Sequence, residues 1–375
     1  MLGWAGETLT RRLRSLVEMS LVRRVLPLLA LLGAALALPG TALANLRRPQ
    51  PLVKTVTETA AFPDRVIDSG PITARAASTG ASAYQAPDGT TVQVSFDAAY
   101  REDPAVAQTY VDYLGGLPHG TELGRLKLLL APPDQVTDEC GGVSGVLACY
   151  DGRSHQMIVP GEPISSDSGV STAYVITHEY GHHVASFRNN PPFKALDWGP
   201  KYWASYKLVC NLVLDGRLAP GAEGTFYRAN PGEGWAETYA RLTYPDQPWM
   251  FTSLLKPDAA ALEAARRDVL DPWHQPATQP YVGRFTLSGP DEKIVQFPLN
   301  LDGALKIKLS GPAKSNYDLV VSSLDKRRGA TKTPGSQDQL KWSAACRQRR
   351  SETVTVRILR RSGSGPFTVS VDDAG

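Results

Sequence analysis

Two histidines four residues apart, His178 and His182, mark the part of the chain best suited to chemistry, and Glu179 directly follows the first of them. On a helix, positions i and i+4 lie one above the other, so both imidazoles can reach one metal ion. Glu179 is rotated by about 100° from His178, so its carboxylate can reach a metal-bound water without being a ligand. This spacing predicts the ligand pair and the general base of a zinc hydrolase.

The residues around this motif predict the helix that it needs. Apolar side chains recur along the segment at Val170, Tyr174, Val175, Ile176, Val184 and Phe187. Ser168 or Ser171 can cap its N-terminus, and the run Asn189-Asn190-Pro191-Pro192 ends it. An ordinary helix that happens to carry two histidines would look the same, so a third ligand downstream has to support the metal site.

Two glutamates further along the chain are the candidates for that third ligand. Glu233 and Glu237 follow Pro231 and Gly232, which begin a helix, and they stack one turn apart on one face. One of them can bind the metal while the other accepts a hydrogen bond from a ligating imidazole. The alternative is a solvated helix face with two like charges, but aromatic and small neighbours such as Trp235 favour burial.

In combination, His178-Glu179-x-x-His182 and Glu233-x-x-x-Glu237 resemble the motifs of the gluzincin metallopeptidases, the thermolysin-like clan. The resemblance spans the stretch from 174 to 242. It implies that His178, His182 and Glu233 hold Zn²⁺, that Glu237 supports a histidine, and that Glu179 activates the water.

The match departs from thermolysin itself in three respects. Glu237 stands where that enzyme has an aspartate, Gly232 replaces the usual asparagine, and the gap after His182 is longer. The pattern is nearer to the lethal-factor-like members of the clan. Such enzymes also use a tyrosine or histidine to hydrogen-bond the oxyanion, and Tyr227 is the candidate for that role. An ordinary core or surface tyrosine is the alternative.

The N-terminus reads as an export signal. Arg23-Arg24 precede an apolar run over 25–38, and small residues lead to a cleavage site after Ala44. We therefore expect residues 1–44 to be a signal peptide, with Met1 or Met19 as the start. A membrane anchor is the alternative, but the run is shorter than a bilayer span requires. The predicted protein is secreted, with no stable membrane association after cleavage. Residues 45–90 are expected to be a linker or a propeptide.

Composition and cysteine usage agree with this reading. The 375 residues suffice for two folded domains, and a net charge of +3 gives no electrostatic case for nucleic-acid binding. Cys140 and Cys149 can close a small disulfide. Cys210 and Cys346 can pair across the two domains or remain buried thiols. No C-x-x-C spacing indicates a cysteine zinc site.

Short strands before the metal motif and helices after it predict an α+β domain over 91–275, and the resemblance to gluzincins implies that this domain is a zincin-like catalytic domain. Strands are expected at 91–96, 126–130 and 156–159, and helices at 104–114 and 200–214. The strand at 156–159 is the candidate for the sheet edge that receives an extended substrate, and an interior strand is the alternative. His183 points about 100° away from His182 and is expected to take no part.

From residue 281 to 375 the sequence changes to short alternating strands separated by Gly, Pro, Ser and Asp turns, after a linker at 276–280. This spacing predicts an all-β sandwich or jelly roll. Segments such as 297–312 and 362–371 are similar to the bacterial pre-peptidase C-terminal domains of secreted proteases. That resemblance implies an accessory part that docks to a surface or matrix.

The sequence as a whole therefore predicts a secreted zinc-dependent endopeptidase that acts on protein or peptide substrates. The alternative is a secreted binding or adhesion protein whose metal site is structural or degenerate. A closed four-ligand shell would favour the alternative, whereas an open coordination position would favour the enzyme.

Overall fold

The computed structural model describes residues 46–52, 65–67, 80–142, 145–164, 170–323 and 328–374. The described residues belong to one compact unit, Leu46–Gly375. The predicted signal peptide lies outside the described residues, and everything below concerns this unit. Within the described residues, no helix combines the length and the apolar character that crossing a membrane requires.

A mixed sheet of six strands forms the first half of this unit, in the order β1-β5-β6-β4-β3-β2. Its strands are β1 (Arg65–Ile67), β2 (Ser82–Gln85), β3 (Thr91–Phe96), β4 (Lys127–Ala131), β5 (Cys149–Asp151) and β6 (Gln156–Pro160). The central strands β3, β4 and β6 are parallel, whereas β5 and β2 run antiparallel to their inner neighbours. The continuous apolar run of β4 fits a strand buried on both faces.

One expectation about this sheet is wrong, and the sheet extends beyond the predicted range. Strand β6, expected at the edge, lies in the interior because β4 and β5 pair with its two sides. The sheet also begins before residue 91, since β1 and β2 come from the segment predicted as linker or propeptide. Short strands such as these were missed because three or four residues carry no readable alternation.

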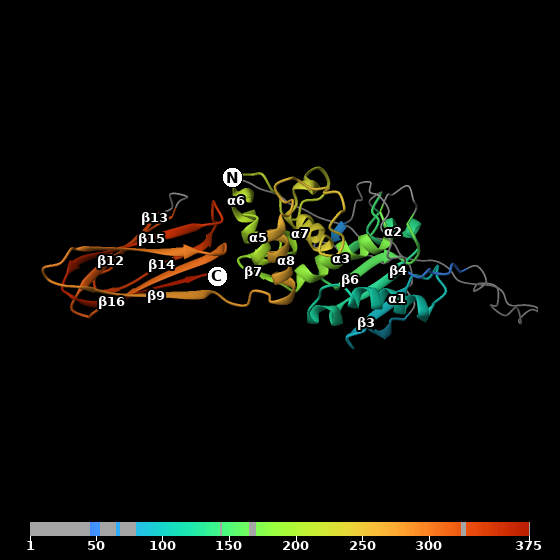
Figure 1. Ribbon diagram of the computed structural model, residues 1–375, viewed down its shortest axis with the longest axis horizontal. Helices are drawn as coiled ribbons and strands as arrows, with labels where there is room; N and C mark the ends of the chain where they lie inside the picture. The colour runs from blue at the N-terminus through green and yellow to red at the C-terminus, as the bar shows by residue number, and fades with distance from the viewer. Residues whose placement is uncertain are drawn as a thin grey trace, which may run out of the picture. The chain divides into compact units, whose positions relative to one another are not determined.

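Helices cover the sheet and complete this half (Figure 1). They are α1 (Pro104–Gly115), α2 (Pro133–Glu139), α3 (Thr172–Ser186), α4 (Ala195–Trp198), α5 (Lys201–Tyr206), α6 (Val209–Leu214), α7 (Pro231–Ala240) and α8 (Ala259–Leu270). The helix predicted over 200–214 is broken into α5 and α6, because Leu208 adopts a φ of 55°, in the left-handed region. The helix predicted over 104–114 is confirmed as α1, which Asp103 caps.

Residues from 277 onward form a pair of four-stranded antiparallel sheets, with the orders β10-β15-β12-β13 and β14-β11-β16-β9. Their strands are β9 (Ala277–Phe285), β10 (Glu292–Leu299), β11 (Gly303–Ser310), β12 (Asn316–Ser322), β13 (Arg328–Thr331), β14 (Gln337–Ala345), β15 (Glu352–Ser362) and β16 (Gly365–Asp373). They run side by side in orange to red in Figure 1. The linker predicted at 276–280 is wrong, because most of it belongs to β9, which as an edge strand tolerates Pro280.

Separate hydrophobic cores underlie these halves. The mixed sheet has a large core with most of its helices and a smaller one that joins α2 to β4, β5 and β6, and a further core lies between the two sandwich sheets. In coarse features this agrees with the predicted α+β part followed by an all-β sandwich. Each half therefore excludes water from its own apolar interior.

Buried polar contacts and a disulfide join the two halves. Lys201 donates through Nζ to the carbonyl of Asp302 at 2.9 Å, and Arg347 donates to the carbonyl of Ser205 at 2.6 Å. Cys210 and Cys346, whose pairing the sequence left open, form a disulfide. The predicted bond between residues 140 and 149 is also present. Two disulfides are compatible with an exported protein.

Candidate metal centre

Helix α3 carries the two histidines and is buried along almost its whole length. Ser171 caps it by accepting a hydrogen bond from the Tyr174 N–H at 3.1 Å. Every residue from Thr172 to Ala185 is buried, which is typical of a core helix. The rings of His178 and His182 lie on one face with centroids 5.2 Å apart. The helix therefore presents both imidazoles to the same point, as the i, i+4 spacing requires.

Helix α7 brings the glutamates to that point. Asn230 caps it by accepting from the Gly232 N–H at 3.0 Å, and Pro231 occupies its first turn. The helix crosses α3 closely because Gly181 has no side chain, since a Cβ there would lie 2.9 Å from the Cα of Ala236. Trp235 fixes the same crossing by donating through Nε1 to the Gly181 carbonyl at 2.9 Å.

Three side chains converge where these helices cross. One carboxylate oxygen of Glu233, Oε2, lies 3.4 Å from His178 Nε2 and 3.4 Å from His182 Nε2. One ligand atom from each side chain lies within 4.8 Å of the others. In the part of the chain that the structure describes, no other group of three such side chains comes this close. All three side chains are at most 1% exposed.

Glu237 contacts the ring nitrogen of His178 that does not face Glu233. Its Oε2 lies 3.2 Å from His178 Nδ1, and both side chains are fully buried. A hydrogen bond at Nδ1 leaves Nε2 as the lone-pair nitrogen that faces Glu233. Glu237 therefore selects the tautomer that a metal ligand needs.

The donor set fits a divalent metal ion. The Oε1 atoms of Glu233 and Glu237 are buried without a hydrogen-bond partner among the described residues. Leaving carboxylate oxygens buried and unsatisfied is costly, and a bound cation would remove that cost for Glu233. Two imidazole nitrogens and one carboxylate suit zinc and its neighbours in the transition series. A three-residue set also leaves one position for water, which is the pattern of catalytic sites.

The two remaining predicted site residues are Glu179 and Tyr227. Glu179 follows His178 on α3 and is completely buried. Tyr227 is in the short 3-10 helix η4 (Gly224–Ala229), and its ring packs on Phe251 with centroids 5.4 Å apart. Phe251 in turn stacks on His178 at 6.2 Å. Tyr227 and His178 therefore pack on the same aromatic ring, that of Phe251.

His183 points away from the cluster, in the direction that its sequence position predicts. Its Nε2 lies 2.8 Å from the carbonyl of Glu122, which accepts the proton, and its Nδ1 lies 3.2 Å from the Tyr150 hydroxyl. Burial lowers the pKa of His183 to about 3. It is a neutral histidine that ties α3 to β5.

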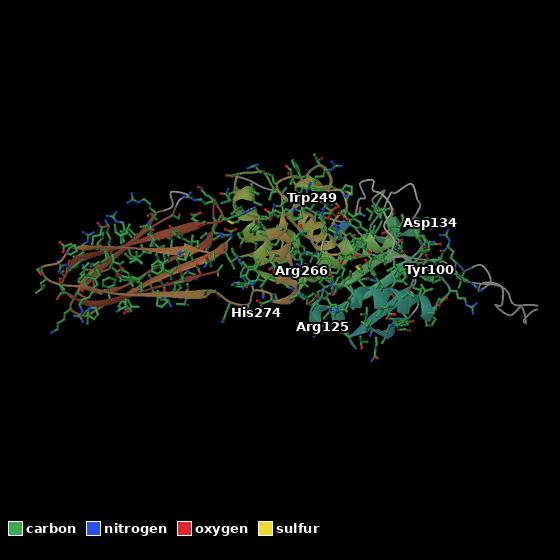
Figure 2. All side chains as sticks on the ribbon, viewed as in Figure 1. Tyr100, Arg125, Asp134, Trp249, Arg266 and His274 are labelled. Carbon is green, nitrogen blue, oxygen red and sulfur yellow. A yellow bond between two sulfur atoms is a disulfide. The ribbon has the colours of Figure 1, made fainter. Side chains whose placement is uncertain are left out.

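Sequence reasoning missed two residues of the site. Phe251, which covers one face of His178, lies in the loop between α7 and α8 together with Trp249, labelled in Figure 2. An irregular loop has no periodicity, so nothing in the sequence placed it there. Gly181 could have been found, because a glycine inside a helix costs about 1 kcal/mol relative to alanine and usually has a packing reason.

Comparisons with known proteins leave the family open. No protein-family description and no curated protein matches the chain. A mitogen from Yersinia pseudotuberculosis is similar to 26% of it, at 17% identity and a TM-score of 0.20 over 86% of the mitogen. PliG, a periplasmic inhibitor of g-type lysozyme from Aeromonas hydrophila, matches 26% of the chain at 13% identity, with a TM-score of 0.17 over 85% of PliG. A family two carbohydrate esterase from Cellvibrio japonicus matches 26% of the chain and 35% of the esterase, at 12% identity and a TM-score of 0.13. At these scores the similarities carry no argument about function, which has to be inferred from the metal centre.

Proposed function

We propose that this chain is a secreted, zinc-dependent endopeptidase of the gluzincin type, with a zincin-like catalytic part and a sandwich that docks it to a surface. One observation carries the proposal. The ligand atoms of His178, His182 and Glu233 lie within 4.8 Å of one another, and Glu179 stands on the same helix as both histidines. A helix such as α3 could carry two histidines by chance. A glutamate of α7 that lies beside both of them is a second, independent observation in favour of a metal site.

The residues of the chain have separate tasks in this reaction. When bound, a zinc ion would polarise the scissile carbonyl and acidify the attacking water. Glu179 takes the proton from that water and returns it to the leaving amine. Glu237 keeps His178 in the ligating tautomer. The hydroxyl of Tyr227, buried without a partner among the described residues, is the candidate donor to the oxyanion.

The number of ligands favours an enzyme over a structural metal site. A structural zinc site is closed by four protein ligands, whereas a catalytic one has three and an open position. The described residues supply three. The alternative of a binding or adhesion protein with a degenerate site has no comparable observation in its favour.

The test is metal content together with casein hydrolysis, measured on the mature protein and on Glu233→Ala and Glu237→Ala variants. We expect one zinc per chain, chelator-sensitive hydrolysis, and loss of both in the Glu233 variant. Zinc without any hydrolysis would argue for a structural site. Absence of zinc from the unmodified protein would end the proposal.

A further inference from the structure

The outer edge of β5 is the one feature near the metal centre that the proposed function leaves without a role. Strand β1 fills that edge, with Arg65, Val66 and Ile67 in parallel register opposite Cys149, Tyr150 and Asp151. Strand β5 has β6 on its other side. The sheet would therefore end at β5 if residues 65–67 were not there.

This edge is the one beside the metal helix. The hydroxyl of Tyr150, in the middle of β5, lies 3.2 Å from His183 Nδ1 and 2.7 Å from Ser186 Oγ, both on α3. His183 is the residue after the ligand His182. The opposite edge of the sheet, β2, pairs with β3 and packs against α1 instead. An extended peptide that added to the sheet and also reached α3 would have to add at β5.

Residues 46–52, which precede β1 in the sequence, also bind to the folded part of the chain. Arg47 forms a bidentate ion pair with Asp134, labelled in Figure 2, at 2.5 and 2.9 Å. The backbone of Arg47 donates to the Ala99 carbonyl at 2.9 Å, and Gln50 donates to the Gly161 carbonyl at 2.7 Å. A passive linker needs no such attachments. Residues 46–52 instead hold the start of the segment against the sheet.

The metal centre is closed to solvent. His178, Glu179 and His182 have no exposed surface, and Glu233 is 1% exposed. A polypeptide substrate cannot reach these groups while they are covered in this way. Access therefore requires that some part of the chain leave its place.

We propose that the outer edge of β5 is the surface on which an extended peptide adds as a strand, and that β1 of the same chain occupies it and keeps the enzyme latent. Peptides that add to an exposed sheet edge are bound through main-chain hydrogen bonds, which any sequence can supply. Strand β1 uses the same bonds. This inference rests on the proposed peptidase function and gives β1 the role of an internal inhibitor.

The experiment compares the full chain with Val66→Pro/Ile67→Pro and with the matched control Val66→Ala/Ile67→Ala. Successive N–H groups of a strand point to opposite sides, so one of the two prolines must remove a donor that faces β5. The alanines keep both N–H groups. Three quantities are measured on each protein: zinc content, Glu179-dependent casein hydrolysis per zinc, and hydrogen exchange of the backbone amides of Cys149–Asp151.

We expect the proline variant to exchange these amides faster and to hydrolyse casein at least about tenfold faster, which corresponds to about 1.4 kcal/mol of lost strand pairing. The alanine variant should match the unmodified chain in both. Faster exchange with unchanged hydrolysis would overturn the inference while leaving the peptidase intact. Faster exchange with no Glu179-dependent hydrolysis in any protein would instead overturn the peptidase itself, and the inference with it.

Discussion

His178 Nδ1 lies 3.2 Å from Glu237 Oε2, and neither side chain has any exposed surface. This pair connects the two helices of the metal centre at a point that water does not reach. The carboxylate orients the ring and makes its other nitrogen a better ligand, because the shared proton is partly withdrawn toward Glu237. In the proposed metal centre, Glu237 would thus act on the metal without touching it.

Replacing Glu237 by glutamine should therefore weaken metal binding without abolishing it. The amide can still accept the hydrogen bond, but it no longer carries the charge that raises the basicity of the ring. We expect metal affinity to fall by about 10- to 100-fold, measured by competition with a chelator. Glu263→Gln is the matched control, since that carboxylate is exposed on α8 and pairs with Arg266 at 3.4 Å. Equal affinity in both variants would contradict the role of Glu237.

The Glu179→Gln variant should still bind the metal but should lose most of its hydrolytic activity. The residue is not among the three ligands, so zinc content should equal that of the unmodified chain. Removal of a general base typically costs about 10²- to 10⁴-fold in rate, and hydrolysis of a peptide substrate should fall within that range. Near-normal turnover in this variant would contradict the assignment of Glu179.

Gly181→Ala should push α3 and α7 apart. The added Cβ would lie 2.9 Å from the Cα of Ala236, which is backbone and cannot move aside alone. Overpacking of this kind costs about 1–3 kcal/mol, against a gain of about 1 kcal/mol in helix propensity. We expect a lower Tm and weaker zinc binding. Gly80→Ala is the control, because no atom lies within 4 Å of its added Cβ. Unchanged zinc affinity would show that the crossing tolerates the methyl group.

Stability should fall as the pH rises from about 4 to about 7, through Asp268. Burial raises its pKa to about 7, although the N–H groups of Trp203 and Tyr202 donate to it and act in the opposite direction. The folded state then binds more protons than the unfolded state between the two pKa values, so this contribution is full below pH 4 and is lost through pH 7. Three pKa units correspond to about 4 kcal/mol.

Urea unfolding at several pH values checks this by comparison with Asp268→Asn, which cannot titrate. The difference in free energy of unfolding between the unmodified chain and the variant should shrink as the pH rises. A difference that is constant between pH 4 and pH 7 would mean that Asp268 is ionised throughout.

Removal of the disulfide between Cys140 and Cys149 should lower stability by about 3 kcal/mol, the loop-closure value for a ring of about ten residues. Cys149 also begins β5, so the double alanine variant should loosen the strand that pairs with β1. The measurement is thermal unfolding with and without a reducing agent. The variant should no longer respond to reduction at this site.

The parts of the fold that could be predicted are those with long, regular patterns. Helix α3 was predicted because its apolar residues, cap and stop signals all agree, and the sandwich strands because alternation and turns recur. The convergence of Glu233 and Glu237 on the histidines could be predicted because a zinc site, were it present, would need a third ligand downstream. In these cases the local sequence pattern agrees with the place of the segment in the tertiary structure.

What could not be predicted depends on contacts between distant segments. The interior place of β6 follows from β5, a strand of three residues that has no periodicity to recognise. The break at Leu208 arises from a left-handed backbone conformation that no helix-propensity argument indicates for leucine. Phe251 reaches His178 from an irregular loop. In each of these cases tertiary packing decided the outcome.

The disulfide between Cys210 and Cys346 determines what happens when a protease cleaves the chain between these two residues. Its two cysteines are 136 residues apart in sequence, and the loop that they close contains α7 with Glu233 and the connection from α8 to β9. A cut anywhere in that loop leaves both fragments covalently tethered. A molecule nicked between the two halves would therefore keep the sandwich attached to the part that carries His178, His182 and Glu233, until a reductant separates them.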